Sequence, residues 1–136
     1  MWKPKKWMPI VVWKKFMDWW SDLNGFGVAG MTLPLLIILR YDGEDETWTD
    51  RKRKWFKGLV NHEGIHIMQQ VELLVVGFFL AYGINYLVNR IKGMDHKKAY
   101  YEIIFEREAY DNQDNYDYID GRKWFAPFRS YWKSSK

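Results

Sequence analysis

The stretch His62-Glu63-Gly64-Ile65-His66 lies near the middle of the chain and matches the pattern H-E-x-x-H. We predict that it belongs to a helix, on which residues four apart share one face, so both imidazoles can reach a single Zn²⁺ ion. Glu63 then lies beside the metal, where it can take a proton from a metal-bound water molecule. The chain has only three histidines, and two of them stand in this pentapeptide. The stretch therefore predicts a zinc-binding helix.

The length and composition are typical of one globular domain. The 136 residues are enough to bury a core, and a charged fraction of 28% is not that of a disordered chain. We treat residues 1–136 as a single domain, with a basic, aromatic segment at residues 1–25 and a basic, aromatic tail at residues 121–136. The absence of cysteine excludes disulfides, thiolate ligands and a cysteine nucleophile.

The net charge and the placement of basic residues indicate which kinds of partner the chain could bind. The net charge is +4, and many basic residues alternate with Trp and Tyr, a composition that suits an anionic membrane surface or a nucleic acid. No nucleic-acid-binding motif accompanies these residues, so we expect no nucleic-acid partner. The apolar stretch at 8–13 is short and has no small-residue cleavage site after it, so we predict no signal peptide. Cytoplasmic and membrane-associated locations stay open, as does the oligomeric state.

The spacing of apolar residues predicts an α+β fold that is mostly helical. Pro34 suggests an edge or bent strand, and the histidine motif lies on a long helix that continues into the next apolar run. The expected elements are a helix at 13–23, extended chain at 30–41, a short returning strand at 47–49, a helix that begins between 49 and 61 and ends near 91, and a helix at 97–114.

The apolar run at residues 73–88 raises the question of a membrane span. Its sixteen residues are fewer than the roughly 20 that a spanning helix needs, and Asn85 interrupts them. We therefore predict a buried core helix, with attachment to a membrane interface as the alternative.

A catalytic zinc site needs a third protein ligand, because such sites hold the metal with three side chains and a water. The metzincin spacing is not met, since Gln69 and Glu72 stand where that class has a glycine and its third histidine. His96, in a predicted loop, is one candidate. Glu106 and Glu108 on the later helix are the others, and they are about 200° apart, so they cannot both face the metal. Both lie on apolar faces, which leaves the choice open.

Gln69 follows His62 by seven residues. It therefore lies about 20° from His62 around the helix, on the ligand face. We predict that it orients a metal ligand through a hydrogen bond.

The histidine motif followed by Glu106-Arg107-Glu108-Ala109 resembles the gluzincin pattern, in which a later helix carries E-x-x-A or E-x-x-S. The resemblance implies that Glu106 is the third zinc ligand. The stretches 61–70 and 105–112 are also similar to those of small bacterial and phage-borne zincins, over about residues 26–125. This similarity implies a minimal zincin-like fold, in which a short hairpin or small sheet packs on the active-site helix and on a second, glutamate-bearing helix.

The chain departs from the gluzincin pattern at one position. Gluzincins often have an Asp four residues after the ligand glutamate, where it holds the first histidine, and this chain has Tyr110 there. We expect Tyr110, Asp111 or a backbone carbonyl to orient His62 instead. Tyr110 is also a candidate donor to the transition state, together with Tyr100 and Tyr101.

These residues predict a zinc metallopeptidase. His62, His66 and Glu106 would bind Zn²⁺, Glu63 would act as the general base, and a peptide or protein would be the substrate. The alternative is a non-catalytic domain that is stabilised by zinc and binds a membrane surface or a partner.

Overall fold

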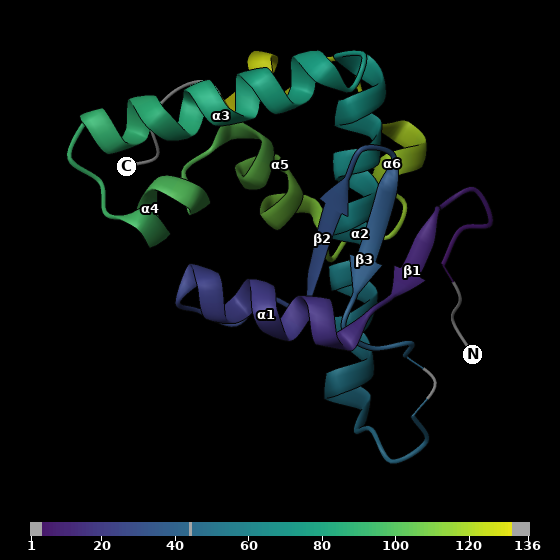
Figure 1. Ribbon diagram of the computed structural model, residues 1–136. Coiled ribbons are helices and arrows are strands. Elements are labelled where there is room, and N and C mark those ends of the chain that lie inside the picture. Colours follow the sequence, from purple (N-terminus) through teal and green to yellow (C-terminus); the bar gives the residue numbers. More distant parts are fainter. Residues whose placement is uncertain (1–3, 44, 132–136) are drawn as a thin grey trace.

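The computed structural model describes residues 4–43 and 45–131, and it confirms a mostly helical α+β fold with one small sheet (Figure 1). A long helix that crosses behind the sheet is the centre of the arrangement. In chain order the elements are β1 (Ile10–Val12), α1 (Lys14–Asn24), β2 (Gly30–Leu33), β3 (Leu36–Leu39), α2 (Asp50–Glu72), α3 (Val76–Ile91), α4 (His96–Tyr101), α5 (Ile104–Asn112), α6 (Tyr118–Gly121) and the π-helix η1 (Pro127–Tyr131).

The sheet has the order β1-β3-β2, with β1 parallel and β2 antiparallel to β3. The predicted extended chain at 30–41 is a tight hairpin, because Pro34 and Leu35 form a turn in which Leu35 has a positive φ of 52°. Gln70 of α2 holds this turn, since its Oε1 accepts from Leu35 N at 2.7 Å and its Nε2 donates to Leu33 O at 3.0 Å. The hairpin is thereby fixed to α2.

The prediction of a strand at 47–49 is wrong. Thr47 instead donates its backbone N–H and its hydroxyl to Asp45 Oδ1, at 2.8 and 2.6 Å, which makes a local turn. Thr49 is the N-cap of α2 and accepts from Lys52 N at 3.2 Å. The sheet gains its third strand from β1, whose three residues were not predicted as a strand.

Helix α2 is buried over most of its length, from Phe56 onward. One side packs against the sheet and the other against α5. Gly64 gives room for this packing, because a Cβ there would stand 2.6 Å from the terminal methyl of Met8, which would have to shift. The buried cluster around α2 comprises Met8, Ile37, Leu39, Phe56, Val60, Ile65, Ile67, Ala109 and Ile119.

The long helix predicted to continue to residue 91 is broken after Glu72. Leu74 and Val75 have positive φ values of 56° and 62°, and the axes of α2 and α3 differ by 111°. Val75 N donates to Gln70 O at 2.7 Å, which closes the end of α2. The bend turns α3 back over the molecule, where Phe78 packs on Phe105 of α5.

The prediction that residues 73–88 form a buried core helix is also wrong. Only Phe78 and Asn89 of α3 are buried, and most of its aliphatic side chains face outward. Within the described residues, no single helix is long and apolar enough to cross a membrane, although α2 and α3 as a bent pair meet that test by length and composition.

The last predicted helix, 97–114, is divided into α4 and α5. Asn85 of α3 accounts for the division, because its Oδ1 accepts from Ile104 N at 2.8 Å and so satisfies the first turn of α5. Asn89 donates to Ala99 O, at 2.9 Å, in α4. These two polar residues of α3 thus fix the direction in which α5 points at α2.

Candidate metal centre

Three side chains from two helices converge at one point. His62 and His66 lie one turn apart on α2, and Glu106 lies in the first turn of α5. Their side chains are 5%, 5% and 4% exposed, so the point is largely buried. Ala109, a small buried residue one turn after Glu106, lets α5 approach α2 closely.

The spacing of the three donor atoms fits a tetrahedral metal ion. Glu106 Oε1 lies 3.0 Å from His62 Nε2 and 3.1 Å from His66 Nε2, and the two Nε2 atoms are 3.2 Å apart. A tetrahedral Zn²⁺ with bonds of about 2.0–2.1 Å separates its ligand atoms by roughly 3.3 Å. Two imidazoles and a carboxylate are also donors that zinc prefers. The donor set and its spacing thus match a zinc ion with one further position open.

The electrostatics of the cluster require a positive charge. Burial favours the neutral carboxyl of Glu106, but the two histidines outweigh this effect and hold the pKa of Glu106 well below its usual range. Burial lowers the pKa of His66, yet the charge of Glu106 and its hydrogen bond raise it to about 9. A buried carboxylate is stable only with a compensating cation. A proton on His66 or a metal ion can supply it.

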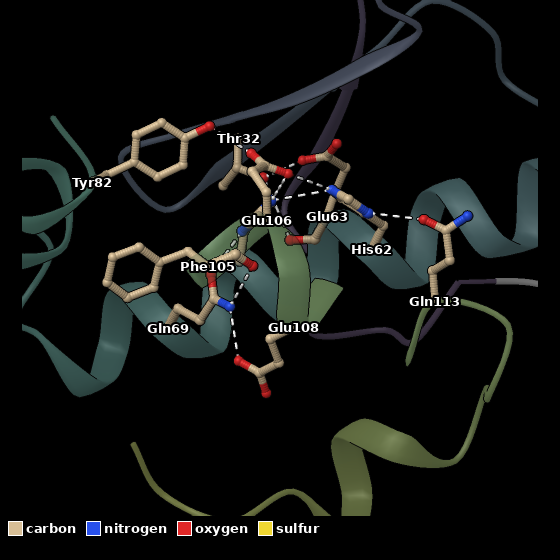
Figure 2. Close-up of polar contacts among 10 residues, drawn as sticks. Thr32, His62, Glu63, Gln69, Tyr82, Phe105, Glu106, Glu108 and Gln113 are labelled. Atoms are coloured by element: carbon tan, nitrogen blue, oxygen red, sulfur yellow. Dashed lines mark hydrogen bonds and ion pairs between the residues drawn. The ribbon is translucent and has the colours of Figure 1, made fainter. Parts of the chain in front are cut away.

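Each histidine is oriented by a glutamine. Nδ1 of His66 lies 2.7 Å from Gln69 Oε1, and Nδ1 of His62 lies 2.9 Å from Gln113 Oε1. When each Nδ1 donates its proton to an amide oxygen, each Nε2 presents a lone pair to the metal. Figure 2 shows Gln113 and Gln69 on opposite sides of the cluster.

A second contact fixes the amide of Gln69. Its Nε2 donates to Phe105 O at 3.0 Å and to Glu108 Oε1 at 2.8 Å, so its oxygen is turned toward His66 (Figure 2). Gln69 thus lies on the ligand face, where its spacing placed it. Gln113 was missed, although it follows Glu106 by seven residues, the spacing that separates His62 from Gln69. The same arithmetic applied to the second helix would have found it.

The structure separates Glu106 from the other two candidates for third ligand. Glu108 is fully buried away from the histidines, where Arg122 Nε donates to it at 2.6 Å and the Tyr118 hydroxyl at 2.6 Å. His96 lies at the start of α4, with its Nδ1 at 2.8 Å from the Tyr86 hydroxyl. Neither belongs to the group of side chains that could hold a metal ion.

The predicted role of Asp111 is wrong. Asp111 is exposed and faces Tyr131, while Gln113 takes the place beside Nδ1 of His62. Tyr110 does adjoin the site, but through its ring, whose centroid is 4.4 Å from that of His62. Burial and the charge of Glu106 raise the pKa of Tyr110, so its hydroxyl stays protonated at neutral pH. The same hydroxyl hydrogen-bonds with those of Tyr100 and Tyr101.

Two further contacts were not predicted from the sequence. The Tyr82 hydroxyl of α3 donates to Glu106 Oε2 at 2.5 Å, and the Thr32 hydroxyl of β2 donates to Glu63 Oε2 at 2.6 Å (Figure 2). Each hydrogen bond occupies one carboxylate oxygen. Oε1 of Glu106 is thereby left to face the histidines. Both contacts depend on bends between elements, and the local sequence carries no signal for them.

Two hollows meet at Glu63. The larger, of about 490 Å³, is apolar and extends between α1, β2 and α3, with Phe78 and Trp20 in its wall. The smaller, of about 220 Å³, lies on the His62 side and is lined by Tyr100, Tyr101 and Tyr110. A molecule in either hollow therefore lies next to Glu63 and one of the histidines.

The site is thus a two-histidine, one-carboxylate donor set with a second carboxylate beside it. Comparison of the chain with protein-family models, with curated proteins and with solved structures finds no match.

Proposed function

We propose that this protein is a small zinc-dependent metallopeptidase of the gluzincin type, in which His62, His66 and Glu106 bind Zn²⁺. The observation that carries the proposal is the convergence of these three donor atoms within 3.0–3.2 Å of one another, on a helix where Glu63 stands between the two histidines. The group that could hold a metal in the described parts of the chain has three members. Three protein ligands are typical of catalytic zinc, whereas structural zinc usually has four.

When bound, zinc supplies a Lewis acid that polarises a carbonyl and makes water acidic enough to lose a proton near neutral pH. Glu63 would accept that proton and deliver it to the leaving amine. The Thr32 hydroxyl, bonded to Oε2, holds the carboxylate so that Oε1 is the oxygen that takes part. Tyr110, whose ring lies 4.4 Å from that of His62 and whose hydroxyl is protonated, would be the donor to the oxygen on which negative charge develops.

Strand β2 favours a peptide over other amides. In the described parts of the chain β2 pairs with β3 alone, so its second edge is open to an extended peptide. Gly30, Met31, Thr32 and Leu33 of this strand line the larger hollow together with Glu63. A Cβ on Gly30 would stand 3.1 Å from the side chains of Leu39 and Leu59 and 3.4 Å from Glu63 Cγ, so the strand lies close to the general base at this position.

The test is Glu63→Gln, which keeps the shape of the side chain but removes the base. Zinc content should stay the same as in the wild type, while hydrolysis of fluorogenic peptides falls by about 10²–10⁴-fold, the usual contribution of a general base. Glu46→Gln, on an exposed loop, is the matched control and should keep full activity. Equal hydrolysis by both variants would overturn the catalytic assignment. A wild type that binds zinc but cleaves no peptide would favour the non-catalytic alternative.

A further inference from the structure

Helix α3 carries a continuous apolar stripe on its outer face. Five aliphatic residues recur every three or four positions and share one side of the helix. Isolated exposed aliphatic residues are ordinary, but a contiguous stripe marks a surface that meets another apolar body. The stripe consists of Val76, Leu80, Ile84, Leu87 and Ile91, which are 77%, 64%, 53%, 58% and 85% exposed.

The inner face of α3 is already occupied. Phe78 and Tyr82 pack against Phe105 of α5, and Asn85 and Asn89 hydrogen-bond the backbone of α5 and α4. The helix therefore cannot roll to bury its stripe within its own chain. Figure 1 shows α3 along one edge of the molecule, with part of the yellow C-terminal segment behind it.

Aromatic side chains extend the stripe at the N-terminal end of α3. Phe125 N donates to Glu72 Oε2 at 2.6 Å, which holds the segment around Phe125 against the end of α2, just before α3 begins. Trp124 and Phe125 are 60% and 45% exposed there. Trp is enriched where an apolar phase meets water, because its ring suits both.

Basic residues stand at both ends of the stripe. Lys123 and Arg129 accompany the aromatic pair at one end, and all are exposed. At the other end, exposed Arg90 lies in the last turn of α3 and exposed Lys92 follows it, while exposed Lys97 and Lys98 are on α4, which packs against the inner face of α3. The full basic set is Arg90, Lys92, Lys97, Lys98, Lys123 and Arg129. We name the stripe, the two aromatic residues and this basic set the α3 surface.

We propose that the α3 surface binds the interface of an anionic lipid bilayer, with α3 lying in the plane of the membrane. Lipid tails would cover the stripe, Trp124 would sit at headgroup depth, and anionic headgroups would complement the basic set. Helix α3 alone is too short to span, since its 16 residues cover about 24 Å and a bilayer core is about 30 Å thick.

The charges argue against a second copy of the chain as the occupant. Two α3 surfaces face to face would bring like charges together at the ends of the stripe, which is unfavourable. A lipid surface supplies the opposite sign. The inference does not depend on zinc. Tyr82, which donates to Glu106, is on the inner face of α3, whereas the stripe is on the outer face. Membrane binding would hold the metal centre close to the bilayer surface.

The experiment is co-sedimentation of the full chain with vesicles of phosphatidylcholine alone and of phosphatidylcholine with phosphatidylglycerol. We expect binding to the anionic vesicles at least tenfold stronger than to the neutral ones, and weaker binding at 0.5 M than at 0.1 M salt because of screening. No binding of the folded protein to either kind of vesicle would overturn the proposal.

A matched pair of leucines tests the location of the surface. Leu80 and Leu23 are both on helices and both 64% exposed, but Leu23 is on α1, away from α3 in Figure 1. Leu80→Glu should weaken vesicle binding at least tenfold, and Leu23→Glu should leave it within twofold of the wild type. Equal loss in both variants would contradict the assignment to α3.

A second variant tests whether the basic residues contribute to membrane binding. Sedimentation without lipid tests whether a second copy of the chain covers the stripe instead. Lys92→Gln with Lys97→Gln and Lys98→Gln should weaken binding to anionic vesicles by at least tenfold and leave binding to neutral vesicles unchanged. If the charge variant binds as the wild type does, the anionic surface is the wrong partner. A dimer that Leu80→Glu dissociates, with no vesicle binding, would assign the stripe to a second copy of the chain.

Discussion

Helices α2 and α3 follow each other in the chain but reverse the usual relation between sequence and burial. The buried residues of α2 include six polar ones, Asn61, His62, Glu63, His66, Gln69 and Gln70. Helix α3 has one charged residue in sixteen, yet only two of its residues are buried. Burial here follows the available partners rather than the polarity of the segment.

The buried polar residues of α2 are tolerated because each has a hydrogen-bond partner. Asn61 Nδ2, for example, lies 2.7–3.2 Å from three carbonyl oxygens at and after the end of α5. Gln69 bonds His66, and Gln70 bonds the hairpin turn. A buried polar group without a partner would cost several kcal/mol. The α2 network is therefore specific, and removing single members should have large effects.

The largest expected effect is the loss of zinc binding when the ligand Glu106 is replaced. Glu106→Gln should weaken zinc binding by on the order of a thousandfold, well beyond the 10–100-fold typical of residues that orient a ligand. Glu108→Gln should weaken it far less, because Glu108 reaches the site only through Gln69. Competition with a chromogenic chelator measures both. The reverse order would show that the third ligand is wrongly chosen.

The next effect is on stability. Glu108→Ala leaves Arg122 as a buried charge that has lost one of its two carboxylate partners, with 2% of its side chain exposed, and should lower the free energy of unfolding by about 3–5 kcal/mol. The exposed pair of Lys5 and Asp120 is the control, since Asp120→Ala should cost less than about 1 kcal/mol. Urea denaturation measures both. A loss below 1 kcal/mol for Glu108→Ala would mean that the buried network adds little.

The two glutamines should have similar, intermediate effects. Gln69→Leu and Gln113→Leu each remove the acceptor for one histidine Nδ1, and each should weaken zinc binding about 10–100-fold. The ligand atoms themselves stay in place. If neither substitution changes zinc affinity, the histidines are oriented by packing alone.

These glutamines also show how far the sequence alone could predict the site. The two histidines and Gln69 follow from helix geometry, and Glu106 from the resemblance to the gluzincin pattern. Tyr82 could not be predicted, because it reaches Glu106 only through the bend at Leu74 and Val75, two branched residues with positive φ and no Gly or Pro beside them. Local propensity gives no signal for such a bend.

The fold was predictable to a similar extent. The helical character of residues 50–72 and the presence of a small sheet were predicted, whereas β1 is too short, at three residues, to stand out. Helix α3 was predicted to be buried, but most of it is exposed. Its hydropathy indicates an apolar segment and does not indicate which other part of the molecule, if any, packs against it. Its outer face meets no other part of the described chain.

Zinc affinity should decrease as the pH is lowered. The pKa of His66, raised to about 9 by Glu106 despite its burial, means that the metal displaces a proton at neutral pH. Affinity should then drop about tenfold for each pH unit below 9, as measured by chelator competition at pH 7 and 8. Without metal, the same raised pKa stabilises the fold fully below about 6.5, and that contribution is lost as pH rises through 9. An affinity that does not change between pH 7 and 8 would contradict this coupling.

The smallest expected effect is on the stability of α3. Leu80→Glu replaces a side chain that is 64% exposed, so the free energy of unfolding should change by no more than about 0.5 kcal/mol. Thermal or urea unfolding of the lipid-free protein measures it. A loss above 2 kcal/mol would indicate that the stripe is covered within the folded chain.

The most direct test of the proposed metal centre is the metal content of the purified protein after dialysis, measured by inductively coupled plasma mass spectrometry. We predict one zinc ion per chain in the wild type and in Glu63→Gln, and none in His66→Ala. Zinc that is absent from the folded wild type, or that persists at one per chain in His66→Ala, would contradict the proposed centre.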